Sequence, residues 1–180
     1  MVLAGDANND WVLTQRILAG RGVEASLEAI TEVYQEVYLG TSTSAGLRES
    51  ERLLVARDIL SSLSDRLPLA IVTGRPREEA EWFLEREGLT ALFQAVVCME
   101  DGPLKPDPAP VRTASSRLGV ERAWMIGDTP DDIRAAAGAG AVPIGVVAPG
   151  PDPAASAVAL REAGAATVLA AVDDLMELIP

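Results

Sequence analysis

Histidine is absent from the 180 residues, and this absence excludes Ser-His-Asp and Cys-His catalysis, histidine general bases and the usual zinc sites. Cysteine occurs once, at Cys98, so the chain cannot form an internal disulfide and gives no sign of an oxidising compartment. Because Cys98 lies in the apolar run 95–99, we expect a buried structural thiol rather than a nucleophile. Any chemistry must therefore come from carboxylates, hydroxyls, arginines and the single lysine.

Positive charge and long apolar segments are also scarce. The net charge of −12 argues against nucleic acid or an anionic membrane as a partner, since both bind basic surfaces. The longest uncharged stretch, residues 135–151, contains four glycines and three prolines, so we predict neither a signal peptide nor a membrane span. We therefore expect a cytoplasmic protein. The length suits one domain, or one domain and a small subdomain, and the apolar fraction of 48% is ordinary for a globular protein.

Residues 1–65 have the pattern of a small helical region. Apolar residues follow a helical stripe from Leu27 to Tyr38, and a second stripe runs from Leu53 to Leu63. An earlier helix is expected to begin at Asn9 or Asp10. Between the helices, the glycine-bounded segment 40–46 is expected to be a polar loop.

Residues 66–180 alternate between strands and helices. The expected helices run from Pro76 to Gly88, from an Asp107 N-cap to Gly119, and onward from Pro130. Uniformly apolar strands separated by helices predict an α/β fold with a doubly wound parallel sheet. The apolar runs that predict strands are 69–72, 95–99, 123–126, 142–147 and 167–169.

Three polar residues follow predicted strands, where open α/β sheets bind their ligands: Thr73, Lys105 and Asp128. Lys105 is the only lysine among 15 basic residues, and a compact ammonium between two prolines suits a phosphate oxygen or a carboxylate. A lysine retained by chance is the alternative. Thr73, followed by Gly74, could present its hydroxyl to a phosphate or could simply cap a strand end.

An acidic cluster surrounds Asp128. Thr129 as N-cap, Pro130 at the first helical position and a carboxylate at the third resemble a capping box. The helix dipole also favours both Asp131 and Asp132 in the first turn, and this structural interpretation is preferred for Asp131. Capping does not explain Asp128, which precedes the helix and suits a Mg²⁺ ligand. For Asp132, metal binding and capping remain equally good interpretations.

These motifs resemble those of the haloacid dehalogenase (HAD) superfamily, subfamily IA. The segments are IVTGRPREEAEWFLEREG, CMEDGPLKPDP and WMIGDTPDDIRAA, in the order of the family's motifs two to four. The resemblance covers roughly residues 67–180 and implies a HAD-like core, and the helical region before it resembles the subfamily's cap. It also implies an aspartyl-phosphate mechanism that hydrolyses a small phosphorylated substrate with Mg²⁺. The site residues implied are Thr73, Gly74, Arg75 and Lys105 for phosphate, and Asp128 and Asp132 for the metal.

The family's first motif, a strand ending in Asp-x-Asp-Gly, has no counterpart here. The short run beginning at Val2 comes nearest, but it places Asn8 where a proton donor is required. In the family that strand lies between those leading to Thr73 and Asp128, so the central nucleophile strand is apparently missing. We therefore expect a shortened, poorly active chain, unless the sheet closes by direct pairing or with a strand from another chain.

Two further interpretations stay open. A non-catalytic protein that binds phosphate or metal is the alternative function, whereas the order of the motifs argues against a receiver domain. The cap residues Asn8, Asn9, Asp10 and Trp11 could set substrate specificity, or could serve only as helix cap and core anchor. Substrate identity and oligomeric state are not predicted.

Overall fold

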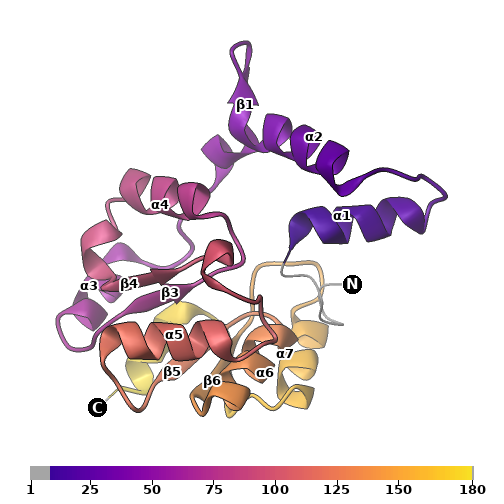
Figure 1. The fold of residues 1–180 in the computed structure, drawn as a ribbon. Helices are drawn as coiled ribbons and strands as arrows, with labels where there is room; N and C mark the ends of the chain where they lie inside the picture. Colours follow the sequence, from indigo (N-terminus) through magenta and orange to yellow (C-terminus); the bar gives the residue numbers. More distant parts are fainter. Residues whose placement is uncertain (1–8, 180) are drawn as a thin grey trace. The chain divides into compact units, whose positions relative to one another are not determined.

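The computed structural model describes residues 9–179, which divide into two compact units, residues 9–54 and residues 55–179 (Figure 1). The sequence places its boundary at residue 65. The structure assigns the helix that precedes residue 65 to the second unit. That the two units act as a cap and a catalytic core stays a prediction.

The first unit is built on two helices, α1 (Asp10–Ala19) and α2 (Leu27–Leu39), which pack against each other. As predicted, Asn9 caps α1, because its side-chain oxygen accepts the backbone N–H groups of Trp11 and Val12. The Tyr34 hydroxyl donates a 3.0 Å hydrogen bond to Asp10 and so ties the beginning of α1 to α2. The side chains of Asn9 and Asp10 therefore have structural roles within this unit.

The segment 40–46, predicted to be a loop, is a small antiparallel hairpin of β1 (Gly40–Thr41) and β2 (Ser44–Ala45), followed by the 3-10 helix η2 (Leu47–Ser50). The two glycines allow the backbone to come this close. A Cβ atom at Gly40 would lie 2.4 Å from the nitrogen of Gly46, and one at Gly46 would lie 2.1 Å from the carbonyl oxygen of Tyr38. Close backbone approach, rather than flexibility, explains these glycines.

The helix predicted from Leu53 is shorter than its apolar stripe. Helix α3 spans Arg57–Ser64 and buries Leu60 and Leu63, as expected, but Leu53 lies outside it. Ala56 is extended at the N-cap, and its N–H donates to the carboxylate of Asp173, 3.3 Å away. This tertiary contact fixes the start of the helix, and sequence periodicity could not reveal it.

The second unit contains the five predicted strands, in two parallel sheets. One sheet pairs β3 (Ala70–Val72) with β4 (Ala95–Val97), and the other has the order β5-β6-β7. The remaining strands are β5 (Trp124–Gly127), β6 (Val142–Val146) and β7 (Thr167–Leu169). The α-helices that connect them are α4 (Arg77–Arg86), α5 (Ala109–Leu118), α6 (Pro130–Ala139) and α7 (Pro153–Glu162). Short 3-10 helices are η3 (Thr90–Leu92), η4 (Met99–Asp101) and η5 (Val172–Glu177).

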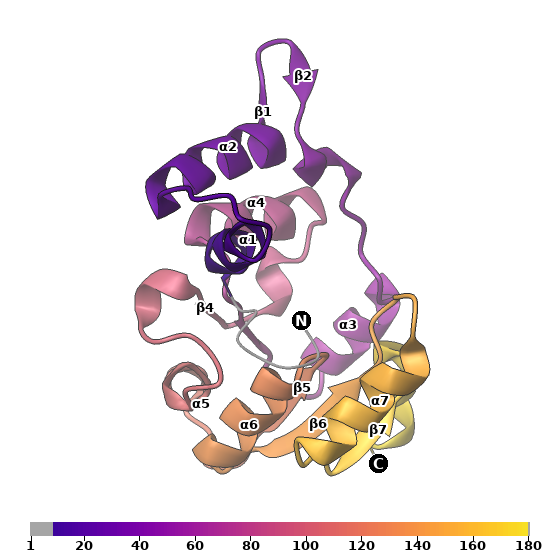
Figure 2. The ribbon, with the colours of Figure 1, turned by 90° about the vertical axis from the view of Figure 1, so that its right-hand side faces the viewer.

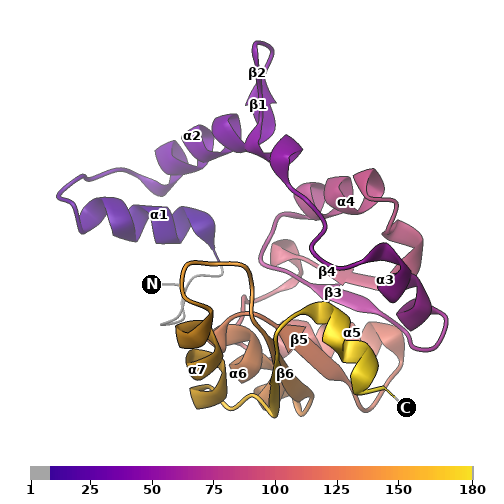
Figure 3. The ribbon, with the colours of Figure 1, turned by 180° about the vertical axis from the view of Figure 1, so that it is seen from behind.

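Helices lie on both sides of these sheets. Helix α5 packs on β3 and β4, α6 packs on β5 and β6, and α5 contacts α6 (Figure 1). Figure 2 shows α6 and α7 side by side next to β6, and Figure 3 shows α3 and the C-terminal η5 on the opposite side. Ile133 of α6 and Leu160 of α7 are fully buried in the core of this unit. This arrangement confirms the predicted α/β class.

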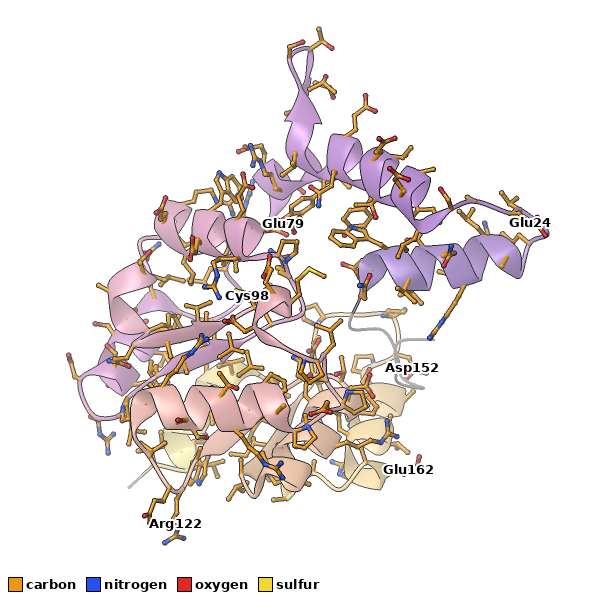
Figure 4. All side chains as sticks on the ribbon, viewed as in Figure 1. Glu24, Glu79, Cys98, Arg122, Asp152 and Glu162 are labelled. Carbon is orange, nitrogen blue, oxygen red and sulfur yellow. The ribbon has the colours of Figure 1, made fainter. Side chains whose placement is uncertain are left out.

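The start of α5 also differs slightly from the prediction. Helix α5 begins at Ala109, with Pro108 rather than Asp107 at the cap position. The Asp107 carboxylate still accepts the N–H of Ala109 at 2.8 Å, so it satisfies the first free donor from one residue further out. Cys98, labelled directly after β4 in Figure 4, is 3% exposed, which confirms the expected buried thiol. Among residues 9–179, no helix combines the length and the apolar character needed to cross a membrane.

Among the described residues, the two sheets are separated along a boundary between β3 and β5, which we call the seam. Within residues 9–179, β3 and β5 share no ladder of hydrogen bonds. Thr73 N–H bonds to β4, so the alternate residues Ala70 and Val72 direct their N–H and C=O groups away from it. The side chains of β3 are only half-buried, unlike Val97 in β4, which is 1% exposed. The strands that lead to Thr73 and Asp128 therefore each present a backbone edge with no partner strand among the described residues.

Candidate active site

Lys105 connects the ends of the two sheets. Its Nζ donates to the carbonyl oxygen of Val72 at 3.2 Å, at the end of β3, and lies 2.6 Å from Oδ1 of Asp132, in the first turn of α6. The side chains of Lys105 and Asp132 are only 11% and 5% exposed. The single lysine thus forms a buried ion pair across the seam, where a salt bridge is far less screened than at the surface.

Asp132 is held from two directions. Its Oδ2 accepts hydrogen bonds from the backbone N–H and the hydroxyl of Thr129, at 3.0 and 2.7 Å, and completes the predicted capping box. Gly127 makes room for this carboxylate, because a Cβ atom there would lie 2.2 Å from the Cβ of Asp132. Capping and the ion pair with Lys105 therefore engage both carboxylate oxygens.

Asp128 directly follows β5 and is exposed, but its carboxyl group is partly desolvated by the surrounding protein. That partial burial raises the pKa of its carboxyl group, the negative charge of Asp132 raises it further, and Lys105 lowers it. A divalent cation at Asp128 would offset the unfavourable effect of the Asp132 charge. Within residues 9–179 no group of three or more carboxylate, thiol or imidazole side chains forms a metal cluster. The donor set fits Mg²⁺, which commonly uses one or two carboxylates and completes its shell with water and phosphate.

Thr73 lies at the same end of β3 as the Lys105 contact. Its N–H donates to the carbonyl of Val97 at 2.9 Å, and its hydroxyl accepts the N–H of Arg75 at 3.2 Å. The carbonyl of Arg75 in turn accepts the N–H of Met99, which joins the loops after β3 and β4. Thr73, Gly74 and Arg75 thus form a tight turn beside the carbonyl that binds Lys105. Their role in phosphate binding stays a prediction.

The cap candidates lie in the other compact unit. Asn9 caps α1 and Asp10 accepts the hydroxyl of Tyr34, whereas Asn8 lies outside the described residues. A role in specificity for Asn8, Asn9, Asp10 and Trp11 stays a prediction.

Asp101 was not predicted from the sequence. Its carboxylate forms ion pairs with two arginines, Arg77 and Arg117, and lies four residues before Lys105 in the chain. Those arginines are 24 and 16 residues away in the chain, so no local pattern reveals them.

Comparisons with known proteins agree with these motifs. A family described as "Haloacid dehalogenase-like hydrolase" matches residues 23–146. The chain is 41% identical to an imidazoleglycerol-phosphate dehydratase of Phytophthora nicotianae, over 99% of this chain and 43% of that protein. It is 27% identical to a phosphoglycolate phosphatase of Pectobacterium atrosepticum, over 75% of this chain and 59% of that protein. The chain thus spans about half the length of these curated relatives.

A solved structure supports the same assignment. The crystal structure of a putative beta-phosphoglucomutase from Thermotoga maritima superposes with a TM-score of 0.67 and 28% identity. The match covers 89% of this chain and 73% of that one, so it includes most of the parallel sheets and helices. The fold is therefore the HAD-like Rossmannoid fold, and the chain belongs to the haloacid dehalogenase-like hydrolase family.

Proposed function

We propose that this chain is part of a Mg²⁺-dependent phosphate monoester hydrolase of HAD subfamily IA, which acts on a small phosphorylated metabolite through an aspartyl-phosphate. The observation that carries the proposal is the position of Lys105, which lies at the end of β3 and pairs with Asp132. The turn that contains the Thr73 hydroxyl, the Lys105 ammonium and the carboxylates of Asp128 and Asp132 all follow the carboxyl ends of parallel strands, where such sheets bind ligands. Phosphatases among its relatives favour the same class of substrate.

Each residue has a role in this proposal. Lys105 would donate to a phosphate oxygen, and the Thr73 hydroxyl and the N–H groups of Gly74 and Arg75 would surround the others. Asp128 would hold Mg²⁺, and Asp132 would support it while holding Lys105 in place. When bound, the ion supplies positive charge that offsets the charge on the transferring phosphoryl group. The protein's own contribution is positioning and a preformed electrostatic environment.

The 180 residues contain no candidate for the nucleophile that this reaction requires. No Asp-x-Asp pair occurs in the 180 residues, although an aspartyl-phosphate requires a carboxylate that attacks phosphorus. The seam between β3 and β5 is where one further parallel strand would find partners on both sides. We therefore propose that this chain alone is poorly active and gains activity when such a strand is supplied.

The missing carboxylate pair also favours a second candidate, a non-catalytic HAD-like protein that binds phosphate or metal. The two candidates share the binding site and differ only in turnover. Supplying the strand distinguishes them, because a binding protein would remain inactive.

Calorimetry with inorganic phosphate and Mg²⁺ tests the shared site. The wild-type chain should bind both, Asp128→Ala should lose Mg²⁺ binding, and Lys105→Met should weaken phosphate binding. Glu162→Gln is the control, because Glu162 is an exposed carboxylate at the far end of α7 (Figure 4) and should change neither. An absence of binding in the wild type would contradict both candidates. Efficient hydrolysis of p-nitrophenyl phosphate by the 180-residue chain, abolished by Asp128→Ala, would contradict the proposed lack of a nucleophile.

A further inference from the structure

Lys105 lies in a segment that has little regular structure of its own. After η4 ends at Asp101, residues 102–108 form no helix or strand before α5 begins. Gly102 has a φ of +153°, a conformation that side chains of L-amino acids rarely adopt, and the chain changes direction there. The hydrogen bonds of a helix or strand therefore do not fix the position of Lys105 in this segment.

Asp101 is the point at which this segment is held. Its side chain is 14% exposed, and both of its oxygens are engaged. Oδ2 accepts the backbone N–H of Cys98 at 2.7 Å and the guanidinium of Arg77 from α4. Oδ1 accepts the guanidinium of Arg117, at the end of α5, at 2.6 Å. One carboxylate thus joins the end of β4 to two helices.

The two arginines are themselves anchored to the backbone. A second Arg117 nitrogen donates to the carbonyl of Val96 in β4 at 2.8 Å. The backbone N–H of Arg77 donates to the carboxylate of Glu100 at 3.0 Å, so adjacent acidic residues of η4 both hold Arg77. Charge-assisted bonds of this kind are stronger than neutral ones, and a network of them fixes geometry better than a single pair. The hydrogen bonds to Arg117 and Cys98, together with the nearby charge of Arg77, lower the pKa of Asp101, which therefore stays ionised at neutral pH.

We propose that Asp101 is a positioning residue for Lys105. Held by Arg77 and Arg117, it fixes the start of the segment 101–105, so that the ammonium lies between the Val72 carbonyl and Asp132. The inference rests on the proposed function only in assigning Lys105 to phosphate. The placement of Lys105 itself can be measured without any ligand. Small displacements of a charged group that contacts the substrate have large effects, which is why such support matters.

The single lysine makes the test unusually direct. In protein labelled with ¹⁵N-lysine, the one side-chain ammonium signal belongs to Lys105. Asp101→Ala should move or broaden this signal strongly, while the three tryptophan indole signals keep their positions and report an intact fold. Asp101→Asn should give an intermediate shift, because it keeps an acceptor for Cys98 N–H but loses the charge that holds the arginines. Glu81→Gln is the matched control, since Glu81 pairs with the same Arg77 but lies on α4.

A ligand measurement separates this inference from the proposed function. With Mg²⁺ present, Asp101→Ala should weaken inorganic phosphate binding about tenfold, roughly the contribution of one charge-assisted hydrogen bond. If the wild type binds no phosphate, the proposed function fails, but the lysine signal still decides the positioning role. If Asp101→Ala does not fold, Asp101→Asn and Arg117→Gln decide it. A lysine signal that moves no further in these variants than in Glu81→Gln, with the tryptophan signals unchanged, would overturn the inference.

Discussion

Replacing Lys105 with methionine tests the buried ion pair most directly. Methionine keeps the length of the apolar stem but removes the ammonium that lies 2.6 Å from Asp132. Asp132, which is 5% exposed, would keep its two bonds from Thr129, and its other oxygen would lose its cation. Breaking a buried pair by removing one partner costs about 3–5 kcal/mol, because the remaining charge is left uncompensated.

That cost is large compared with the stability of the protein. Domains of this size unfold with free energies of about 5–15 kcal/mol, and urea lowers this free energy by about 1–3 kcal/mol per molar. A loss of about 4 kcal/mol should therefore lower the urea midpoint by about 2 M. By contrast, Glu81→Gln breaks the pair with Arg77, in which both side chains are well exposed, and should cost less than about 1 kcal/mol.

Urea unfolding at pH 7, followed by tryptophan fluorescence and far-ultraviolet circular dichroism, provides the measurement. A double-mutant cycle of Lys105→Met with Asp132→Asn should give a coupling energy of about 2–3 kcal/mol. The difference should persist in 1 M salt, since a buried pair is poorly screened. A Lys105→Met variant that loses less than about 1 kcal/mol would refute the reasoning, because the pair would then behave like an exposed one.

Three other predictions follow from the same geometry. Asp101→Asn should lower the free energy of unfolding at pH 7. Because the pKa of Asp101 is lowered in the folded state, the difference from wild type should shrink as the pH falls below about 4. Urea unfolding at several pH values measures this difference, and a difference that grew on acidification would contradict the prediction. Gly127→Ala should destabilise the chain by at least about 1–3 kcal/mol, because its methyl group overlaps the Cβ of Asp132, whereas Gly150→Ala should be nearly neutral in thermal unfolding. Joining a strand that ends in Asp-x-Asp to the chain should raise p-nitrophenyl phosphate hydrolysis above that of an Asn-x-Asn control, and equal rates for the two would count against the proposed reaction.

Much of the fold could be predicted because the relevant signals are local. Parallel strands covered by helices are apolar throughout, so runs such as 142–147 mark them to within a residue or so. The capping box of Thr129 and Asp132 likewise involves residues only three apart. What failed depended on contacts far apart in sequence, such as that between Ala56 and Asp173, 117 residues away.

In the candidate site too, local signals could be predicted from the sequence, whereas contacts between distant residues could not. The sequence predicted Lys105 and Asp128 as site residues, because Asp128 follows a strand and Lys105 is the only lysine, and their functional roles stay predictions. It could not determine whether Asp132 serves as a helix cap or supports a metal ion, since both require a carboxylate in the same helical turn, and the metal role stays a prediction. In the structure, the Asp132 carboxylate caps the helix and also forms an ion pair with Lys105. The spacing of residues in the sequence could not show that one carboxylate does both.

The edge of β3 that has no partner strand among residues 9–179 has a consequence for how this chain behaves in solution. Proteins usually guard exposed strand edges with charged residues, prolines or bulges, which discourage adhesion between molecules. The triplet Ala-Ile-Val of β3 contains no charged residue or proline, and within the described residues the Lys105 ammonium contacts this edge at the carbonyl of Val72. Lys105→Met would remove this charged group from the β3 edge, and concentrated solutions of the variant should aggregate sooner than those of the wild type.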